Sequence, residues 1–128
     1  MSLWATIIGR PVTKGRPRLG RRRKAFTPAR TVAYEKLVGE EWVRCNPDEP
    51  PLEGPVGMQI VIHSEGVQVE VWELEAGSRP KYVTGDIDNY VKAVSDGLNS
   101  FAYLDDKQVH YIETFFTKEP LENGETNE

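Results

Sequence analysis

The stretch VGMQIVIHSEGVQVEVWEL, residues 56–74, contains two runs rich in β-branched residues, separated by the short segment 64–66. Two such runs on either side of a glycine-containing turn predict a β-hairpin. In the second run the valines fall on one face, whereas Gln68, Glu70 and Trp72 fall on the other. This alternation predicts a hairpin that buries one of its faces.

Further elements are predicted on both sides of the hairpin. An apolar run at 3–8 predicts a first strand, and apolar residues at helical spacing predict one helix over 29–45 and a second from Asn89 onward. Residues 108–117 are rich in β-branched and aromatic side chains, which predicts a final strand. Together these elements predict a small α/β (α+β) fold, a mixed sheet of about four strands with two helices.

The length of 128 residues gives room for one domain with a single core. We expect a single domain over 1–118 that contains a basic loop at 10–30, followed by a flexible acidic tail at 119–128. A core of this size gains stability from a second copy, which favours a homodimer. The length also excludes most nucleotide-driven motors, so no nucleotide cofactor is expected.

The sequence contains neither a run of eighteen apolar residues nor the pattern of a signal peptide. Its one cysteine, Cys45, cannot form an internal disulfide. We therefore expect a cytoplasmic protein that does not bind a membrane.

The charges are distributed unevenly along the chain. Residues 1–44 carry eleven Lys and Arg against three acids, a net charge of +8, and residues 45–128 carry five against seventeen, a net charge of −12. Nine of the basic residues lie in the segment 10–30, which Pro and Gly interrupt. This asymmetry indicates contact with a polyanion at one end of the chain and coordination of cations at the other.

The segment TGDIDNYVKAVSDGLNSFAYLDD, residues 84–106, concentrates the candidate catalytic side chains. Asp86 and Asp88 are two residues apart and point to the same side if the backbone there is extended. Asp88 is also the expected N-cap of the second helix, and Lys92 follows one helical turn later. Two carboxylates and one lysine are therefore expected on one face.

A second acidic pair, Asp105 and Asp106, directly precedes the predicted last strand. If that strand runs beside the element that carries Asp86, four carboxylates meet. Such a cluster is tolerated when it binds a cation, and carboxylates without histidines favour Mg²⁺ or Mn²⁺ over zinc. Hydrolysis of a phosphodiester is the natural reaction of such a site, with Lys92 orienting water or offsetting charge in the transition state. In the alternative interpretation Asp88 only caps a helix and the other acids lie in solvated turns.

The motif GDIDNYVKAVSDGLN followed by YLDD resembles the signature of the RusA endodeoxyribonucleases, Holliday junction resolvases that phages and prophages often carry. The segments GRPVTKGRPR and FTPARTVAYE are similar to the N-terminal pattern of the same family, so the resemblance covers residues 5–118. It implies a homodimeric, Mg²⁺-dependent nuclease of phage or prophage origin. The catalytic residues that the resemblance implies are Asp86, Asp88, Lys92 and one or both of Asp105 and Asp106, with Asp106 as the first choice, and the expected metal ligands are Asp86, Asp88, Asp105 and Asp106.

Basic residues are the candidates for contact with DNA phosphates, because each such contact releases counterions without reading bases. The first choices lie within the family-like motif and are Lys14, Arg16 and Arg18. The next choices are Arg21, Arg22, Arg23 and Lys24. For Arg79 and Lys81 two alternatives stay open, a phosphate contact near the metals or exposed loop charges.

We therefore expect a Mg²⁺-dependent, structure-specific endodeoxyribonuclease, with Mn²⁺ as a substitute metal, that resolves Holliday junctions by paired symmetric nicks in DNA recombination and repair. Its expected partner is branched DNA. One alternative is a noncatalytic nucleic-acid-binding module whose acids only cap helices and maintain solubility. Another is a metal-dependent nuclease that acts on other branched DNA.

Overall fold

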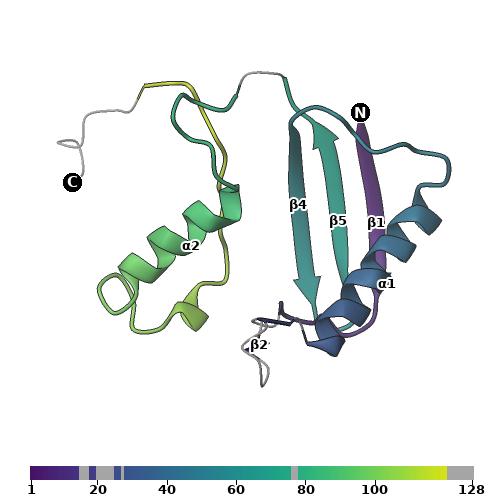
Figure 1. Ribbon diagram of the computed structural model, residues 1–128, viewed down its shortest axis with the longest axis horizontal. Helices are drawn as coiled ribbons and strands as arrows, with labels where there is room; N and C mark the ends of the chain where they lie inside the picture. The colour runs from purple at the N-terminus through teal and green to yellow at the C-terminus, as the bar shows by residue number, and fades with distance from the viewer. Residues whose placement is uncertain (15–17, 20–24, 27, 76–77, 121–128) are drawn as a thin grey trace. The chain divides into compact units, whose positions relative to one another are not determined.

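The computed structural model describes residues 1–14, 18–19, 25–26, 28–75 and 78–120 (Figure 1). The chain forms two compact units, Met1–Glu75 and Ala76–Glu128. The prediction of one domain over 1–118 stays a prediction.

The first unit is built on a three-stranded antiparallel sheet. Its strands are β1 (Ser2–Ile8), β4 (Val56–His63) and β5 (Gly66–Glu73), in the order β1-β5-β4. The predicted first strand and hairpin are confirmed. The sheet nevertheless differs from the expected mixed sheet of four strands, because both pairs of neighbouring strands run antiparallel and the last predicted strand does not join it.

The register of the sheet places apolar side chains together. Val67 on the central strand is paired with Ile7 on one side and Ile62 on the other. Ala5, Ile7 and Val67 are the buried apolar residues among those described. The core of this unit therefore lies on the β1 and β5 side of the sheet, under the first helix.

Helix α1 (Ala29–Cys45) covers this core and has the predicted bounds. Pro28 precedes it, and proline suits a helix start because its fixed φ fits the first turn and it has no N–H to satisfy. At its other end the Asn46 side-chain amide donates to the backbone oxygens of Trp4, at 2.9 Å, and Trp42, at 3.2 Å. This one side chain ties the end of α1 to β1.

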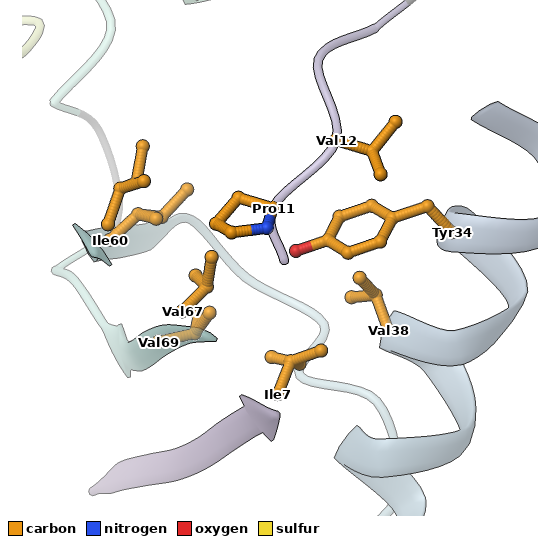
Figure 2. A pocket seen from close by; sticks show the side chains of 9 residues that line it. Ile7, Pro11, Val12, Tyr34, Val38, Ile60, Val67 and Val69 are labelled. Atoms are coloured by element: carbon orange, nitrogen blue, oxygen red, sulfur yellow. The ribbon is translucent and has the colours of Figure 1, made fainter. Parts of the chain in front are cut away.

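An apolar pocket of about 220 Å³ opens between α1 and the sheet (Figure 2). Tyr34 and Val38 approach it from the helix, and Pro11 and Val12 close it from the chain that follows β1. The sheet side is lined by Ile7, Ile60, Ile62, Val67 and Val69. The helix therefore fills the space over β1 and β5 but leaves the apolar face of β4 open.

The predicted basic loop at 10–30 contains two short strands in the structure, β2 (Arg18–Leu19) and β3 (Ala25–Phe26), which pair antiparallel. The remainder of its most basic portion, at 15–17 and 20–24, lies outside the described residues. Most of the predicted tail, at 121–128, also lies outside them.

The second unit contains helix α2 (Ile87–Leu98) and the short 3₁₀ helix η1 (Asp106–Gln108). The predicted strand over 108–117 is not formed, and residues 109–116 carry no regular secondary structure. A run with high strand propensity becomes a strand only when another strand pairs with its backbone, and the described part of this unit supplies none.

Candidate active site

The start of α2 presents two acidic side chains. Asp86 is the N-cap residue and has an extended backbone, with φ −71° and ψ 143°. Asp88 lies inside the first turn, so the expectation that Asp88 caps the helix is wrong by two residues. The expected extended geometry between the two acids is also absent, because Ile87 already begins the helix. Both carboxylates are exposed at a helix N-terminus, where unpaired backbone N–H groups favour negative charge.

Neither of these acids is engaged by the part of the chain that the structure describes. The side chain of Asp86 makes no cap hydrogen bond, although an aspartate at this position usually does. Within the described ranges, no hydrogen bond or ion pair forms on the side chains of Asp86, Asp88 or Lys92. These groups are therefore available to a ligand.

Lys92 lies four residues after Asp88 in the same helix, so both side chains belong to one helical face. The predicted one-turn spacing of carboxylate and ammonium is confirmed. Because no ion pair joins them, the ammonium group of Lys92 is exposed and free to meet an anion.

The second acidic pair has unequal surroundings. Asp105 caps η1, and its carboxylate accepts a 2.8 Å hydrogen bond from the backbone N–H of Lys107. In return, the Gln108 side-chain oxygen accepts from the Asp105 N–H at 2.9 Å, which completes a capping box. The bond from Lys107 holds the pKa of Asp105 below its ordinary value. Asp106 is the first residue of η1 and is exposed.

The two acidic pairs are attached to opposite ends of α2. The hydroxyl group of Tyr103, just before the second pair, donates to the backbone oxygen of Ser95 at 3.1 Å. Ser95 lies nine residues after Asp86, which corresponds to roughly 13 Å along a helix axis. Among the residues that the structure describes, no three His, Cys, Asp or Glu side chains are close enough to hold a metal ion. The structure thus does not bring the four described acids Asp86, Asp88, Asp105 and Asp106 into one group, and a metal site formed by all four has no support from it beyond the prediction.

The available side chains fit a magnesium ion that is shared with substrate. Mg²⁺ retains several waters and is typically bound by one or two carboxylates together with substrate phosphates. Asp86 and Asp88 offer two exposed carboxylates that have no partner among the described residues and no metal-binding group with a described histidine or cysteine of the kind that zinc prefers.

The predicted DNA-binding residues of the basic loop are only partly described. Lys14 lies in the first unit, where its ammonium group forms a 2.5 Å ion pair with the Glu35 carboxylate of α1. Arg18 belongs to β2, but its side chain lies outside the described set. The other arginines and the lysine of this group also lie outside the described residues, namely Arg16, Arg21, Arg22, Arg23 and Lys24.

Arg79 and Lys81 belong to the loop that leads into α2. Nη1 of Arg79 donates to the backbone oxygens of Val83, at 2.9 Å, and Gly85, at 2.8 Å. Lys81 is exposed and makes no such contact among the described residues. The two cations therefore have different surroundings, which their positions in the sequence do not indicate.

Two residues near this site were not predicted. The guanidinium group of Arg79 lies 4.2 Å from the ring centroid of Phe116, and Phe116 contacts the ring of Tyr90 edge to face. The only signal for them in the sequence is a pair of aromatics, one in the first turn of α2 and one near the end of the predicted last strand. That signal does not indicate that the two rings meet.

The class of protein that this start of α2 suggests is an enzyme acting on phosphate esters, since exposed carboxylates and a nearby lysine are side chains that such chemistry can use. The family model described as "Endodeoxyribonuclease RusA" matches residues 9–123. The chain therefore belongs to the RusA endodeoxyribonuclease family, a family of Holliday junction resolvases that act on branched DNA.

One relative is an "Uncharacterized protein YqaN" from Bacillus subtilis (strain 168), which is 30% identical over 126 residues, covering 90% of this chain and 88% of the relative. No solved structure matches the chain. In the described part of the chain, neither α1 nor α2 combines the length and the apolar character that a membrane crossing requires.

Proposed function

We propose that the protein is a Mg²⁺-dependent endodeoxyribonuclease that resolves Holliday junctions by paired symmetric nicks in DNA recombination and repair. The observation that carries this proposal is the start of α2, where Asp86 and Asp88 are exposed and have no partner within the described ranges, and Lys92 follows one turn later. Membership of the RusA family supports the choice of branched DNA as the substrate.

In this proposal Asp86 and Asp88 hold Mg²⁺, with Asp106 as a further predicted ligand and Mn²⁺ as a substitute, whereas Asp105, the other ligand expected from the sequence, serves as the cap of η1. The bound ion supplies activation of water and neutralisation of phosphoryl oxygens. Lys92 places a positive charge beside the phosphate, where it offsets negative charge that develops in the transition state. Attack by water breaks one P–O bond and leaves a 5′-phosphate and a 3′-hydroxyl.

A homodimer is part of the proposal because symmetric nicks on two strands require two active sites. The open apolar face of β4 supports it, since Met58, Ile60 and Ile62 are exposed by 61%, 48% and 69%. Apolar patches of this kind commonly mark contact surfaces. We also propose a cytoplasmic location, supported by the single free cysteine. A phage or prophage origin is part of the proposal because resolvases of this family often occur in such genomes.

The deciding experiment incubates a labelled four-way junction with the protein, with and without Mg²⁺. We expect paired nicks with Mg²⁺ only, and loss of cleavage in Asp88→Asn while binding to the junction in Ca²⁺ is retained. Asp96→Asn is the matched control, because Asp96 is an exposed carboxylate on the same helix.

Three results would contradict parts of this function. Binding without cleavage in the wild type would favour a noncatalytic nucleic-acid-binding module. Preferential cleavage of flaps or forks would favour a nuclease for other branched DNA. Full cleavage by Asp88→Asn would mean that the start of α2 is not part of the catalytic site.

A further inference from the structure

The turn that leads into α2 is held by contacts on both sides of its last residue. The backbone oxygen of Gly85 accepts from Nη1 of Arg79 at 2.8 Å, and its N–H donates to the Tyr90 hydroxyl at 3.0 Å. Asp86 follows directly. These two groups belong to the rigid peptide planes on either side of Gly85, so fixing both restricts the rotation between the planes and the direction in which the Asp86 backbone enters the helix.

The closeness of Tyr90 favours a glycine at this position. A Cβ on Gly85 would lie 3.3 Å from the Tyr90 ring and from its hydroxyl oxygen, which is tighter than ordinary van der Waals contact. The close approach lets the hydroxyl group reach the Gly85 N–H. The residue before the first catalytic acid is therefore shaped to receive this contact.

Aromatic packing holds the two clamping side chains together. The Arg79 guanidinium group lies 4.2 Å from the Phe116 ring centroid, a cation–π distance. The Phe116 and Tyr90 rings meet edge to face, with centroids 6.2 Å apart and planes at 87°. The Phe116 ring therefore supports both Arg79, which donates to the Gly85 oxygen, and Tyr90, whose hydroxyl group accepts from the Gly85 N–H.

The clamped loop also contains an unfavourable backbone conformation. Tyr82 has φ 67°, in the left-handed region that bulky residues rarely occupy, and its side chain is 94% exposed. Such a conformation persists only where surrounding contacts determine it. The two hydrogen bonds from Arg79, to Val83 and Gly85, follow this residue directly and hold the turn closed.

We propose that Arg79 is a positioning residue that fixes the turn before Asp86, with Phe116 and Tyr90 as its supports, and that it is not a DNA-binding residue. This inference rests on the proposed function of Asp86. Nη1 is committed to two carbonyls and one face of the guanidinium group to an aromatic ring. A phosphate contact through Nη1 would have to compete with these bonds, so only Nε and Nη2 could meet a phosphate while the turn stays held, whereas Lys81 has no partner to give up within the described residues.

The test uses Arg79→Lys and Phe116→Leu, with Phe115→Leu as the matched control because the neighbouring Phe115 is 71% exposed. A lysine keeps the charge but cannot reproduce the planar guanidinium group. We expect kcat for junction cleavage to fall roughly ten- to a hundredfold in both test variants, as for a small misplacement of a catalytic group. KM and the dissociation constant for junction DNA in Ca²⁺ stay unchanged, and so does the salt dependence of binding.

A phosphate contact predicts a different result. Loss of such a contact in Arg79→Met weakens binding and lowers the slope of log K against log salt by about 0.9, and kcat is retained. That result would overturn the proposal. Wild-type kcat in Phe116→Leu, at an unchanged melting temperature, would overturn it as well.

Amide hydrogen exchange separates this inference from the proposed function. The Gly85 N–H should be protected in the wild type and in Phe115→Leu, and should exchange faster in Arg79→Lys and Phe116→Leu. If the wild type does not cleave junctions, this pattern still supports the clamp while the proposed function fails. Equal protection of Gly85 in all four proteins would refute the clamp, whatever the activity.

Discussion

The Asp105 carboxylate accepts a 2.8 Å hydrogen bond from the backbone N–H of Lys107, so Asp105 serves as the cap of η1. Its neighbour Asp106 lies in the first turn of the same short helix. The adjacent acids therefore have different tasks, which the sequence alone does not reveal.

We predict that the two acids differ in their effect on cleavage. Asp106→Asn should lower junction cleavage at least roughly a hundredfold, the size typical for loss of a charged group in an active site. Asp105→Asn should stay within about threefold of the wild type, because asparagine caps helices as well as aspartate does. The measurement is the single-turnover rate with Mg²⁺. Equal losses in both variants would assign Asp105 a catalytic task as well.

The cap also predicts a pH dependence. The hydrogen bond from Lys107 lowers the pKa of Asp105 below the ordinary value of 3.8. Since the folded pKa is depressed, the stabilisation of η1 is complete above the unfolded value and is lost as the pH falls through the folded pKa. A carboxyl NMR titration of the metal-free protein should give a midpoint below 3.8 for Asp105. A midpoint at or above that value is incompatible with the cap.

The Lys14 ion pair with Glu35 predicts that DNA binding is partly restrained in the free protein. Both side chains are largely exposed, so the pair contributes only about 0.2–1 kcal/mol. Glu35→Gln should release Lys14 and tighten binding to junction DNA roughly one- to fivefold. Binding in Ca²⁺ at several salt concentrations measures this effect.

Removal of any negative charge also favours DNA binding, so the comparison needs a matched variant. Glu40→Gln makes the same change on the same helix at an exposed residue without a described ion pair. Glu35→Gln should bind more tightly than Glu40→Gln. Equal affinities would mean that Lys14 is not a DNA-binding residue.

How far the sequence predicts the structure depends on whether the signal is local. The bounds of α1 follow from Pro28 and from the helical spacing that starts at Ala29, and both signals lie in the same short segment. The shift of the α2 cap from Asp88 to Asp86 shows the limit of such reasoning, since either aspartate suits a cap. Only the contacts of the turn at Gly85 distinguish them.

Contacts between distant residues could not be predicted. The ring of Phe116 supports Arg79, yet the sequence of residues 108–117 indicates only high strand propensity. Propensity describes a residue's fit to a pleated surface and does not supply a partner strand. The ion pair between Lys14 and Glu35 is similar, because a lysine in a basic loop gives no sign of a partner on a later helix.

Two glycines predict opposite effects of the same substitution on stability. A Cβ on Gly57 would lie 2.4 Å from the ring of Trp72, its partner on β5, so Gly57→Ala should destabilise the first unit by about 1–3 kcal/mol. Gly39 lies within α1 with no atom within 4 Å of an added Cβ, so Gly39→Ala should stabilise by about 0.8–1 kcal/mol. Urea denaturation measures both changes in the free energy of unfolding. If Gly57→Ala leaves this free energy unchanged, the Trp72 ring moves aside without cost.

The open face of β4 predicts the surface through which two copies associate. Met58 is 61% exposed on the edge strand of the sheet, on the same face as the pocket-lining Ile60 and Ile62. A lysine at this position places a charge in an apolar contact, so Met58→Lys should weaken the dimer at least tenfold, or about 1.4 kcal/mol.

Gln59→Lys is the matched control, because Gln59 lies on the opposite face of the same strand. Sedimentation at several concentrations should show monomers for Met58→Lys and dimers for Gln59→Lys. Dimers of equal strength in both variants would exclude this face of β4 as the contact surface.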